Sequence, residues 1–293
     1  MLTIRTDLAA EAHALWRENA GETTQLPGVK AREGEVMGFP LTRVEILDRA
    51  GEEALGKPRG TYLSLDLGEL RGGEDLARAA QAVGEALRPL LPEEGPLLCA
   101  GVGNRDMTPD ALGPLAVDHL LVTRHLGGVL PGLRPVSALA GGVLGDTGLE
   151  AAEWVRGAAQ AVGPGAILLI DALAARSLDR LCTTVQLSDT GLAPGSGVGN
   201  RRMALDRETL GAPVISIGVP TVVDVETVAR DVLGEEGGGA DRPAALGSSA
   251  RRLFVTPDGI DQKVRLLGKV IGYGVSLAAQ EGVSYGELVG LME

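Results

Sequence analysis

The sequence predicts an α/β protein: a three-layer sandwich around a mixed, mainly parallel central sheet. Three short apolar runs, residues 97–100, 166–170 and 213–218, have the length and the Gly and Pro borders of buried parallel strands. Segments with helical spacing of apolar residues alternate with these runs along the chain. Because 44% of the residues are hydrophobic and only 2% are aromatic, the predicted core is aliphatic.

Composition and charge limit the functions open to this chain. Its 293 residues are enough for one large domain, and no shift in composition marks a domain boundary. A net charge of -12 argues against a nucleic-acid backbone as a direct ligand. The N-terminus lacks the pattern of a secretory signal, and no apolar run approaches the roughly 20 residues of a membrane span. We therefore expect a soluble, intracellular protein, with Cys99 and Cys182 reduced and buried in strands.

The N-terminal part of the chain is predicted to be antiparallel. Residues 6–20 have helical spacing of apolar side chains, with Thr6 or Asp7 as the N-cap. Residues 42–47 and 62–67 alternate like half-buried strands that leave one face in water. The charged segment between these two strands is expected to be a connecting loop.

Helices and strands alternate from residue 74 onward. Apolar residues at helical spacing predict a helix over residues 74–87. Residues 108–110, Thr-Pro-Asp, combine a capping hydroxyl, a proline suited to a first turn and an acid near the positive end of a helix. We expect the helix that starts there to include residues 119–122.

The C-terminal half carries further start signals and one polar segment. Residues 147–150 have the spacing of a capping box ahead of a helix over residues 150–162. A second Thr-Pro-Asp at residues 256–258 precedes a long amphipathic helix. Residues 234–242 are polar and rich in glycine, and we expect them to form a mobile loop.

Two acidic residues follow the predicted buried strands. Asp110 lies in the segment after the first strand, and Asp171 comes directly after the second. In open α/β sheets ligands bind beyond the carboxyl ends of the strands, so we expect both acids to meet there and to carry the chemistry. Each also has a plainer interpretation. Asp110 fits a first-turn helix acid, and Asp171 fits a carboxylate that turn amides satisfy.

A close pair of carboxyl groups has a specific chemical use. Two neighbouring acids do not both ionise easily, so one keeps its proton at neutral pH. The ionised acid then activates water while the protonated acid donates to a carbonyl oxygen. Alternatively, both hold a divalent metal whose bound water is the nucleophile. Arg176 either keeps Asp171 ionised or pairs with a surface acid such as Asp179.

The sequence does not match other common catalytic or cofactor-binding motifs. The turn at residues 101–106 has Asp106 where a dinucleotide-binding loop has its third glycine. Ser196 lacks the outer glycines of a nucleophile elbow, and no HExxH zinc motif occurs. Residues 101–107 (GVGNRDM) are echoed at residues 197–203 (GVGNRRM). Either two glycine-rich loops line one site from two sides, or the echo is chance turn chemistry.

Several longer segments match the motifs of a known family. They are residues 5–9 (RTDLA), 101–114 (GVGNRDMTPDALGP), 122–125 (VTRH), 134–138 (RPVSA), 170–177 (IDALAARS), 186–200 (QLSDTGLAPGSGVGN), 208–224 (ETLGAPVISIGVPTVVD) and 254–261 (FVTPDGID). On these segments the chain closely resembles the germination protease family of spore-forming bacteria, whose fold is similar to that of the hydrogenase-maturation proteases.

The resemblance implies an activity and a catalytic pair. It implies an endopeptidase of an atypical aspartic type that cuts small acid-soluble spore proteins in the cytoplasm of the forespore or spore core. It also implies a homotetramer. From the net charge and the lack of a membrane-length apolar run, we expect no direct nucleic-acid partner and no membrane. The acids proposed for the family correspond to Asp110 and Asp171, with Asp171 as the base and Asp110 as the acid, or the reverse. No cofactor is expected; a divalent metal stays open.

The resemblance also implies a zymogen. The family's cleavage within RTDLA corresponds here to the bond between Asp7 and Leu8, which makes residues 1–7 a propeptide and residues 8–293 a single protease domain. A leader this short leaves open whether it inhibits by itself. Further site-lining residues are expected in the glycine-rich loops and beside Asp171, namely Asn104, Arg176, Gly101, Gly103 and Gly197.

Two alternatives stay open beside this interpretation. The first is a metal-dependent, maturation-type protease that uses the same two acids. The second is a protein that binds peptides without cutting them. Chelation and Asp→Asn substitution separate the three, because only the metal enzyme needs a cation and only the binding protein tolerates both substitutions.

Overall fold

The computed structural model describes residues 6–20, 26–127, 132–194, 202–225, 227–228 and 253–292. Within these ranges, the strands are β1 (Val29–Val36), β2 (Phe39–Ile46), β3 (Gly60–Asp66), β4 (Leu97–Gly101), β5 (Val136–Ala140), β6 (Ala166–Ala175), β7 (Thr184–Ser188), β8 (Val214–Asp224) and β9 (Phe254–Val255). The helices are α1 (Ala9–Ala20), α2 (Arg49–Leu55), α3 (Glu74–Leu87), α4 (Leu112–Val117), α5 (Leu144–Thr147), α6 (Ala151–Val162), α7 (Arg207–Leu210), α9 (Ile260–Ala279) and α10 (Tyr285–Met292).

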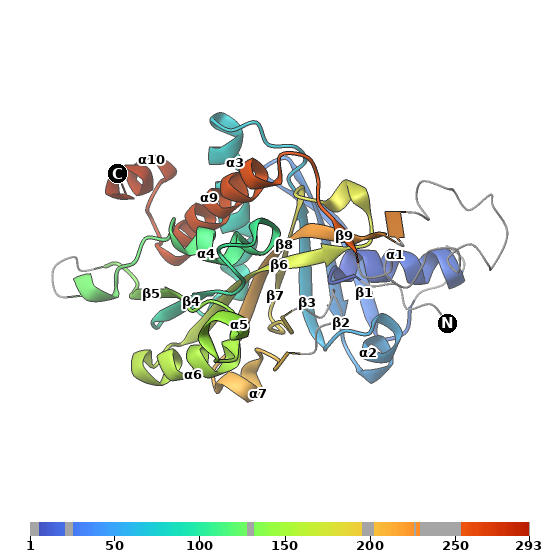
Figure 1. The fold of residues 1–293 in the computed structure, drawn as a ribbon, viewed down its shortest axis with the longest axis horizontal. Helices are drawn as coiled ribbons and strands as arrows, with labels where there is room; N and C mark the ends of the chain where they lie inside the picture. Colours follow the sequence, from blue (N-terminus) through green and yellow to red (C-terminus); the bar gives the residue numbers. More distant parts are fainter. Residues whose placement is uncertain are drawn as a thin grey trace.

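All these strands belong to one mixed sheet, with the order β1-β2-β3-β7-β8-β6-β4-β5 and with β9 paired to β8. The pairs from β1 to β8 in this order are antiparallel, and the pairs from β8 to β5 are parallel. Helices cover both faces of the sheet, which makes an α/β/α arrangement (Figure 1). This confirms the predicted fold class and the antiparallel N-terminal part.

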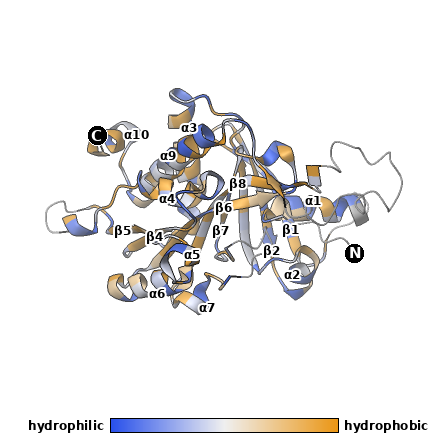
Figure 2. Cartoon of the chain, viewed as in Figure 1, coloured by the Kyte–Doolittle hydropathy of each residue, from blue (hydrophilic) through white to orange (hydrophobic). Residues whose placement is uncertain are grey.

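The main aliphatic core lies between the sheet and the layer of α3, α4 and α9. Side chains on this face alternate with those on the other face along each central strand, as the pleat requires. Ile170 on β6, Leu187 on β7 and Ile217 on β8 all point into this core and are fully buried. Figure 2 shows hydrophobic residues concentrated in the central strands.

The opposite face of the sheet carries several separate apolar clusters, two of which border a cavity. One packs α6 and the α7 region on β4, β6 and β8 through residues such as Val155, Leu169 and Leu210. The other packs α1 and α2 on β2 and β3 through residues such as Val44 and Tyr62. The sheet between these clusters is therefore not covered by a continuous apolar layer.

The N-terminal elements differ from the predictions in three places. β1 was not predicted, because nearly all of its side chains are exposed and its sequence does not alternate. The expected loop after β2 contains α2, which Asp48 caps by accepting from the Gly51 amide. The predicted strand over residues 62–67 does not leave one face in water: Tyr62 and Ser64 are buried on one face, and Leu63 and Leu65 on the other.

The two predicted buried strands have different lengths, and this changes the position of Asp171. β4 ends at Gly101, which pairs with Ile170, whereas β6 continues alongside β8 as far as Ala175. Asp171 therefore lies within β6 and not in a turn after it. Beyond Ile170 the β4 side of β6 has no strand partner among the residues described.

Other helix boundaries also need correction. α4 ends at Val117, so residues 119–122 lie outside it. α1 begins at Ala9, after both predicted N-caps. The capping box of α6 uses Glu150 and Glu153 instead of residues 147–150.

The two cysteines lie in different backbone settings. Cys99 lies in β4 as predicted, but Cys182 is a buried residue with a φ of 57° before β7 and not a strand residue. The predicted mobile loop at residues 234–242 lies outside the described residues. No helix in the described ranges combines the length and apolar character needed to cross a bilayer.

Gly113 sets the distance between α4 and the ends of the parallel strands. A Cβ atom there would lie 2.3 Å from the Val102 carbonyl oxygen and 2.4 Å from that of Ile170. Gly113→Ala should therefore lower the free energy of unfolding by about 1–3 kcal/mol, as measured by urea unfolding. Gly157→Ala on α6, where a Cβ meets nothing within 4 Å, is the control and should be stabilising by up to about 1 kcal/mol. Equal stability of Gly113→Ala and wild type would show that α4 is not held by this contact.

Candidate active site

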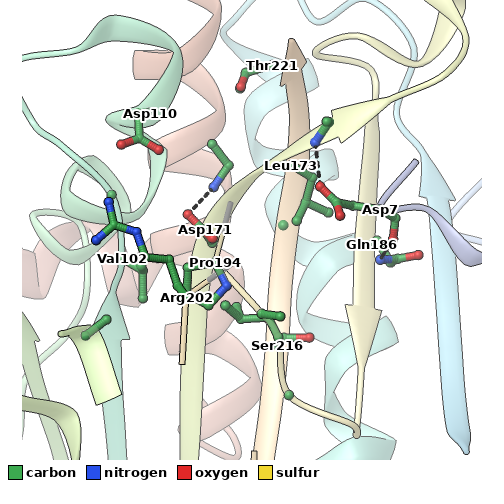
Figure 3. A pocket seen from close by; sticks show the side chains of 18 of the residues that line it. Asp7, Val102, Asp110, Asp171, Leu173, Gln186, Pro194, Arg202, Ser216 and Thr221 are labelled. Atoms are coloured by element: carbon green, nitrogen blue, oxygen red, sulfur yellow. Dashed lines mark hydrogen bonds between the residues drawn. The ribbon is translucent and has the colours of Figure 1, made fainter. Parts of the chain in front are cut away.

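A cavity of about 790 Å³ opens between the two apolar clusters on the second face of the sheet. Its lining includes a row across three neighbouring strands: Gln186 on β7 pairs with Gly218 on β8, which pairs with Asp171 on β6. Directly paired residues point to the same face of a sheet, so Gln186 and Asp171 face the same cavity. Figure 3 shows Asp110, Asp171 and Arg202 on one side of this cavity, with Asp7 and Gln186 on the other.

Asp171 is a carboxyl group within the sheet and is only 4% exposed. Its Oδ1 accepts a hydrogen bond of 2.8 Å from the Ala172 amide. Burial raises the pKa of Asp171 well above its ordinary value, and the negative charge of Asp110 raises it further. The Ala172 hydrogen bond opposes this rise but does not cancel it. Asp171 is thus suited to keep a proton at a pH where an exposed aspartate has lost it.

Asp110 reaches the same cavity from the 3-10 turn Thr108–Asp110, which follows β4. Its Oδ2 accepts a hydrogen bond of 2.7 Å from the Asn104 amide. Thr221 of β8 holds the turn in place by donating to the Pro109 carbonyl oxygen at 2.7 Å. Burial raises the pKa of Asp110, while the Asn104 amide and the positive charge of Arg202 lower it.

The loop between β4 and Asp110 is shaped by two glycines. A Cβ on Gly103 would lie 2.1 Å from the Asp110 carbonyl oxygen, and Gly103 has a φ of 115°, which disfavours any other residue. A Cβ on Gly101 would lie 2.3 Å from the Gly113 carbonyl oxygen. Of the glycine-loop residues predicted for the site, Gly103 and Asn104 line the cavity, whereas Gly101 supports the loop from the end of β4 without lining it. Gly197 lies outside the described residues.

Arg176, which was expected to line the site, is not among the described residues that line the cavity. Its backbone amide donates to the buried Glu11 at 2.8 Å. Among the described residues, Arg202 lines the cavity and places its positive charge near Asp110; its Nη1 also lies 3.9 Å from Glu150 Oε1. Arg176 follows Asp171 by five residues along an extended strand that carries it away from the site.

The segment around Asp7 lies against the same cavity. The Asp7 amide donates to the Ala174 carbonyl oxygen at 3.0 Å, and the Ala174 amide donates to Asp7 Oδ2 at 2.9 Å. Gln186 Nε2 donates to the Asp7 carbonyl oxygen at 2.9 Å, and its Oε1 accepts from the Ala9 amide at 2.7 Å. The side chain of Leu8 is buried in a small cluster with Ala175, Leu181 and Val223.

Lys57 is a half-buried side chain that contacts this segment. It lines the cavity, and its Nζ donates to the Thr6 carbonyl oxygen at 3.3 Å. Burial lowers the pKa of Lys57, while the negative charges of Asp7 and Glu11 raise it. Lys57, Gln186 and Arg202 were not among the residues predicted for the site. Gln186 lies in the family motif at residues 186–200, and Arg202 lies in the repeated motif at residues 197–203, so both could have been found from the sequence. No local pattern distinguishes Lys57.

The arrangement of the two acids is suited to acid–base chemistry. Two desolvated carboxyl groups with raised pKa values face one space, which favours one proton shared between them. Within the described ranges, no group of three or more His, Cys, Asp or Glu side chains is placed to hold a metal ion.

Comparison with known proteins gives the family. The profile of the germination protease family (Peptidase_A25) matches residues 8–234. A germination protease of Caldanaerobacter subterraneus is 40% identical over 98% of this chain and 98% of its own length. One from Clostridium tetani is 38% identical over 95% and 96%, and one from Bacillus cytotoxicus is 44% identical over 78% and 66%.

Among solved structures, a nickel–iron hydrogenase maturation protease, HycI from Thermococcus kodakarensis, aligns with 65% of this chain and 98% of its own, with 16% identity and a TM-score of 0.36. That likeness is too remote to carry an argument. The family profile spans most of the chain, and full-length relatives align with nearly all of it. The chain therefore belongs to the germination protease family.

Proposed function

We propose that this chain is an endopeptidase that cleaves small acid-soluble spore proteins during germination, with Asp110 and Asp171 as its hydrolytic pair. Membership of the germination protease family makes it a peptidase of spore germination. The observation that best supports the pair is that both carboxyl groups line one cavity and that burial raises both pKa values.

The surroundings of the two acids favour a division of roles. Asp110 has a main-chain donor and the charge of Arg202 to favour its ionised form, so it is the base that activates water. Asp171 is more deeply buried and feels the charge of Asp110, so it keeps its proton and donates to the scissile carbonyl oxygen. This is the reverse of the first assignment made from the sequence.

The same proposal covers activation and assembly. The protein is made as a zymogen that is cut between Asp7 and Leu8, and the position of that bond beside the cavity supports this. It acts as a homotetramer in the cytoplasm of the forespore or spore core, on protein substrates and without a nucleic acid, a membrane or a cofactor. A divalent metal held by the same two acids is the rival mechanism.

Substitution of either acid tests the pair. Asp110→Asn and Asp171→Asn should each lower the rate of cleavage of a small acid-soluble spore protein at least about 100-fold, because each removes a proton-transfer group. Asp106→Asn, in the same loop but outside the cavity lining, is the control and should keep the wild-type rate. Intact-mass spectrometry of the substrate, with protein lacking residues 1–7, is the measurement.

The same assay separates the rivals when it is run with and without a chelator. Discrete fragments from wild type that do not depend on the chelator support the carboxyl pair. Fragments that disappear with chelator and return with one metal contradict it in favour of the metal enzyme. An intact substrate under all conditions, with binding retained, favours the non-catalytic alternative.

The pH dependence of cleavage should carry the signature of two desolvated acids. The proposed active form has Asp110 ionised and Asp171 protonated, so kcat/KM should rise through the pKa of Asp110 and fall through that of Asp171. Both limbs should lie above the ordinary aspartate pKa of about 3.9. Arg202→Met should move the rising limb to higher pH, because it removes the positive charge that lowers the pKa of Asp110. A rising limb that does not move would contradict the assignment of Asp110 as the base.

Asp171 should also reduce stability at neutral pH. Its pKa is higher in the folded than in the unfolded state, so the folded protein loses stability as the pH rises from the ordinary aspartate value through the folded one. Asp171→Asn should therefore raise the free energy of unfolding at pH 7 by about 1–3 kcal/mol, with a smaller gain at acidic pH. Urea unfolding at both pH values measures this. A variant less stable than wild type at pH 7 would show that the carboxylate is well satisfied in the fold.

A further inference from the structure

We infer that Gln186 is the positioning residue for self-processing, and that it binds the backbone on both sides of Leu8 and orients the Asp7–Leu8 bond in the cavity. This inference rests on the proposed function, because it concerns the bond that activation is proposed to cut. It assigns a task to a residue outside the acid pair.

The contacts of Gln186 are directed at peptide groups and not at side chains. Its carboxamide donates from Nε2 to the Asp7 carbonyl oxygen at 2.9 Å and accepts at Oε1 from the Ala9 amide at 2.7 Å. These two groups flank Leu8 in the chain, and one planar carboxamide, with its donor and its acceptor, binds both. The carbonyl that receives the N–H donor belongs to the bond proposed for cleavage.

The position of Gln186 in the sheet places it beside the Asp7–Ala9 segment and on the same face as Asp171. It is 8% exposed and lies in one row with Gly218 and Asp171 across β7, β8 and β6. Gly218 places no side chain of its own between them, and a Cβ there would lie 2.5 Å from Leu173 Cγ. Gln186 therefore holds the segment on the same face of the sheet from which Asp171 enters the cavity (Figure 3).

A simpler role must be separated from this one. By accepting from the Ala9 amide, Gln186 also satisfies the first residue of α1, so part of its effect is helix capping. Gln186→Glu keeps the acceptor for Ala9 and removes the donor to Asp7, whereas Gln186→Met removes both at nearly the same size. The comparison of these two variants isolates the donor.

The chain contains a matched control for the loss of such contacts. Gln280 is 1% exposed and binds the backbone of Arg134 in the same two-sided way, with Oε1 accepting from the amide at 2.8 Å and Nε2 donating to the carbonyl oxygen at 3.0 Å. Gln280 does not line the cavity. Gln280→Glu and Gln280→Met therefore show how much the rate of self-cleavage changes when the loss of a buried glutamine affects only the stability of the fold.

The experiment follows self-cleavage of the full chain by intact-mass spectrometry over time, with each variant's unfolding midpoint recorded alongside. Gln186→Glu and Gln186→Met should both slow the cleavage after Asp7 at least about 10-fold relative to wild type, and the Gln280 variants should not. A normal rate for Gln186→Glu with a slow rate for Gln186→Met would reduce Gln186 to a helix cap and overturn the inference. Equal slowing in the Gln280 variants would overturn it as well.

One arm distinguishes this inference from the proposed function. Wild type lacking residues 1–7 is incubated with a small acid-soluble spore protein. If that substrate stays whole, the proposed function fails, whatever the Gln186 variants do. If it is cut, but the full chain cleaves itself equally fast with and without the Gln186 carboxamide, the inference alone fails.

Discussion

The early end of β4 is the constraint on which the candidate site depends. β4 pairs with β6 only as far as Gly101 and Ile170, so the chain leaves the sheet one residue before the level of Asp171. The departing loop turns over the strand ends, where Gly113 approaches the carbonyl oxygens of Val102 and Ile170. That path brings Asp110 near the edge of β6 that β4 no longer pairs with beyond Ile170. A longer β4 would occupy the space where the two carboxyl groups interact.

The second face of the sheet shows how a fold combines a stable core with a polar site. The first face is covered by one aliphatic cluster, which holds more buried apolar side chains than any other cluster of the described residues. The second face divides its apolar contacts among separate clusters, and parts of β6, β7 and β8 line the cavity between two of them. Desolvation of Asp171 is tolerated there because the opposite face of the same strand is anchored in the main core.

Much of the fold and part of the site could be predicted from the sequence, for local reasons. Apolar runs with Gly and Pro borders identify β4, β6 and β8, and acids near their ends, with the family motifs, led to Asp110 and Asp171. The full length of β6 could not be predicted, because β8 supports its second half and pairing partners are not local. Lys57 and Gln186 depend on contacts between segments distant in sequence, and the exposed β1 carries no alternation. Arg176 does not line the cavity because the last four residues of β6 separate it from Asp171.

The order of the strands has a consequence for synthesis. Ala9 and Gln186 are joined by a hydrogen bond although they are 177 residues apart in sequence. The second edge of β3 is paired only once β7 has been made. A ribosome must therefore release most of the chain before the two halves of the cavity come together. Long-range pairings of this kind form late, after local helices and hairpins. The emerging chain consequently passes through synthesis without an assembled site, and cleavage of itself or of its neighbours has to wait for the finished sheet.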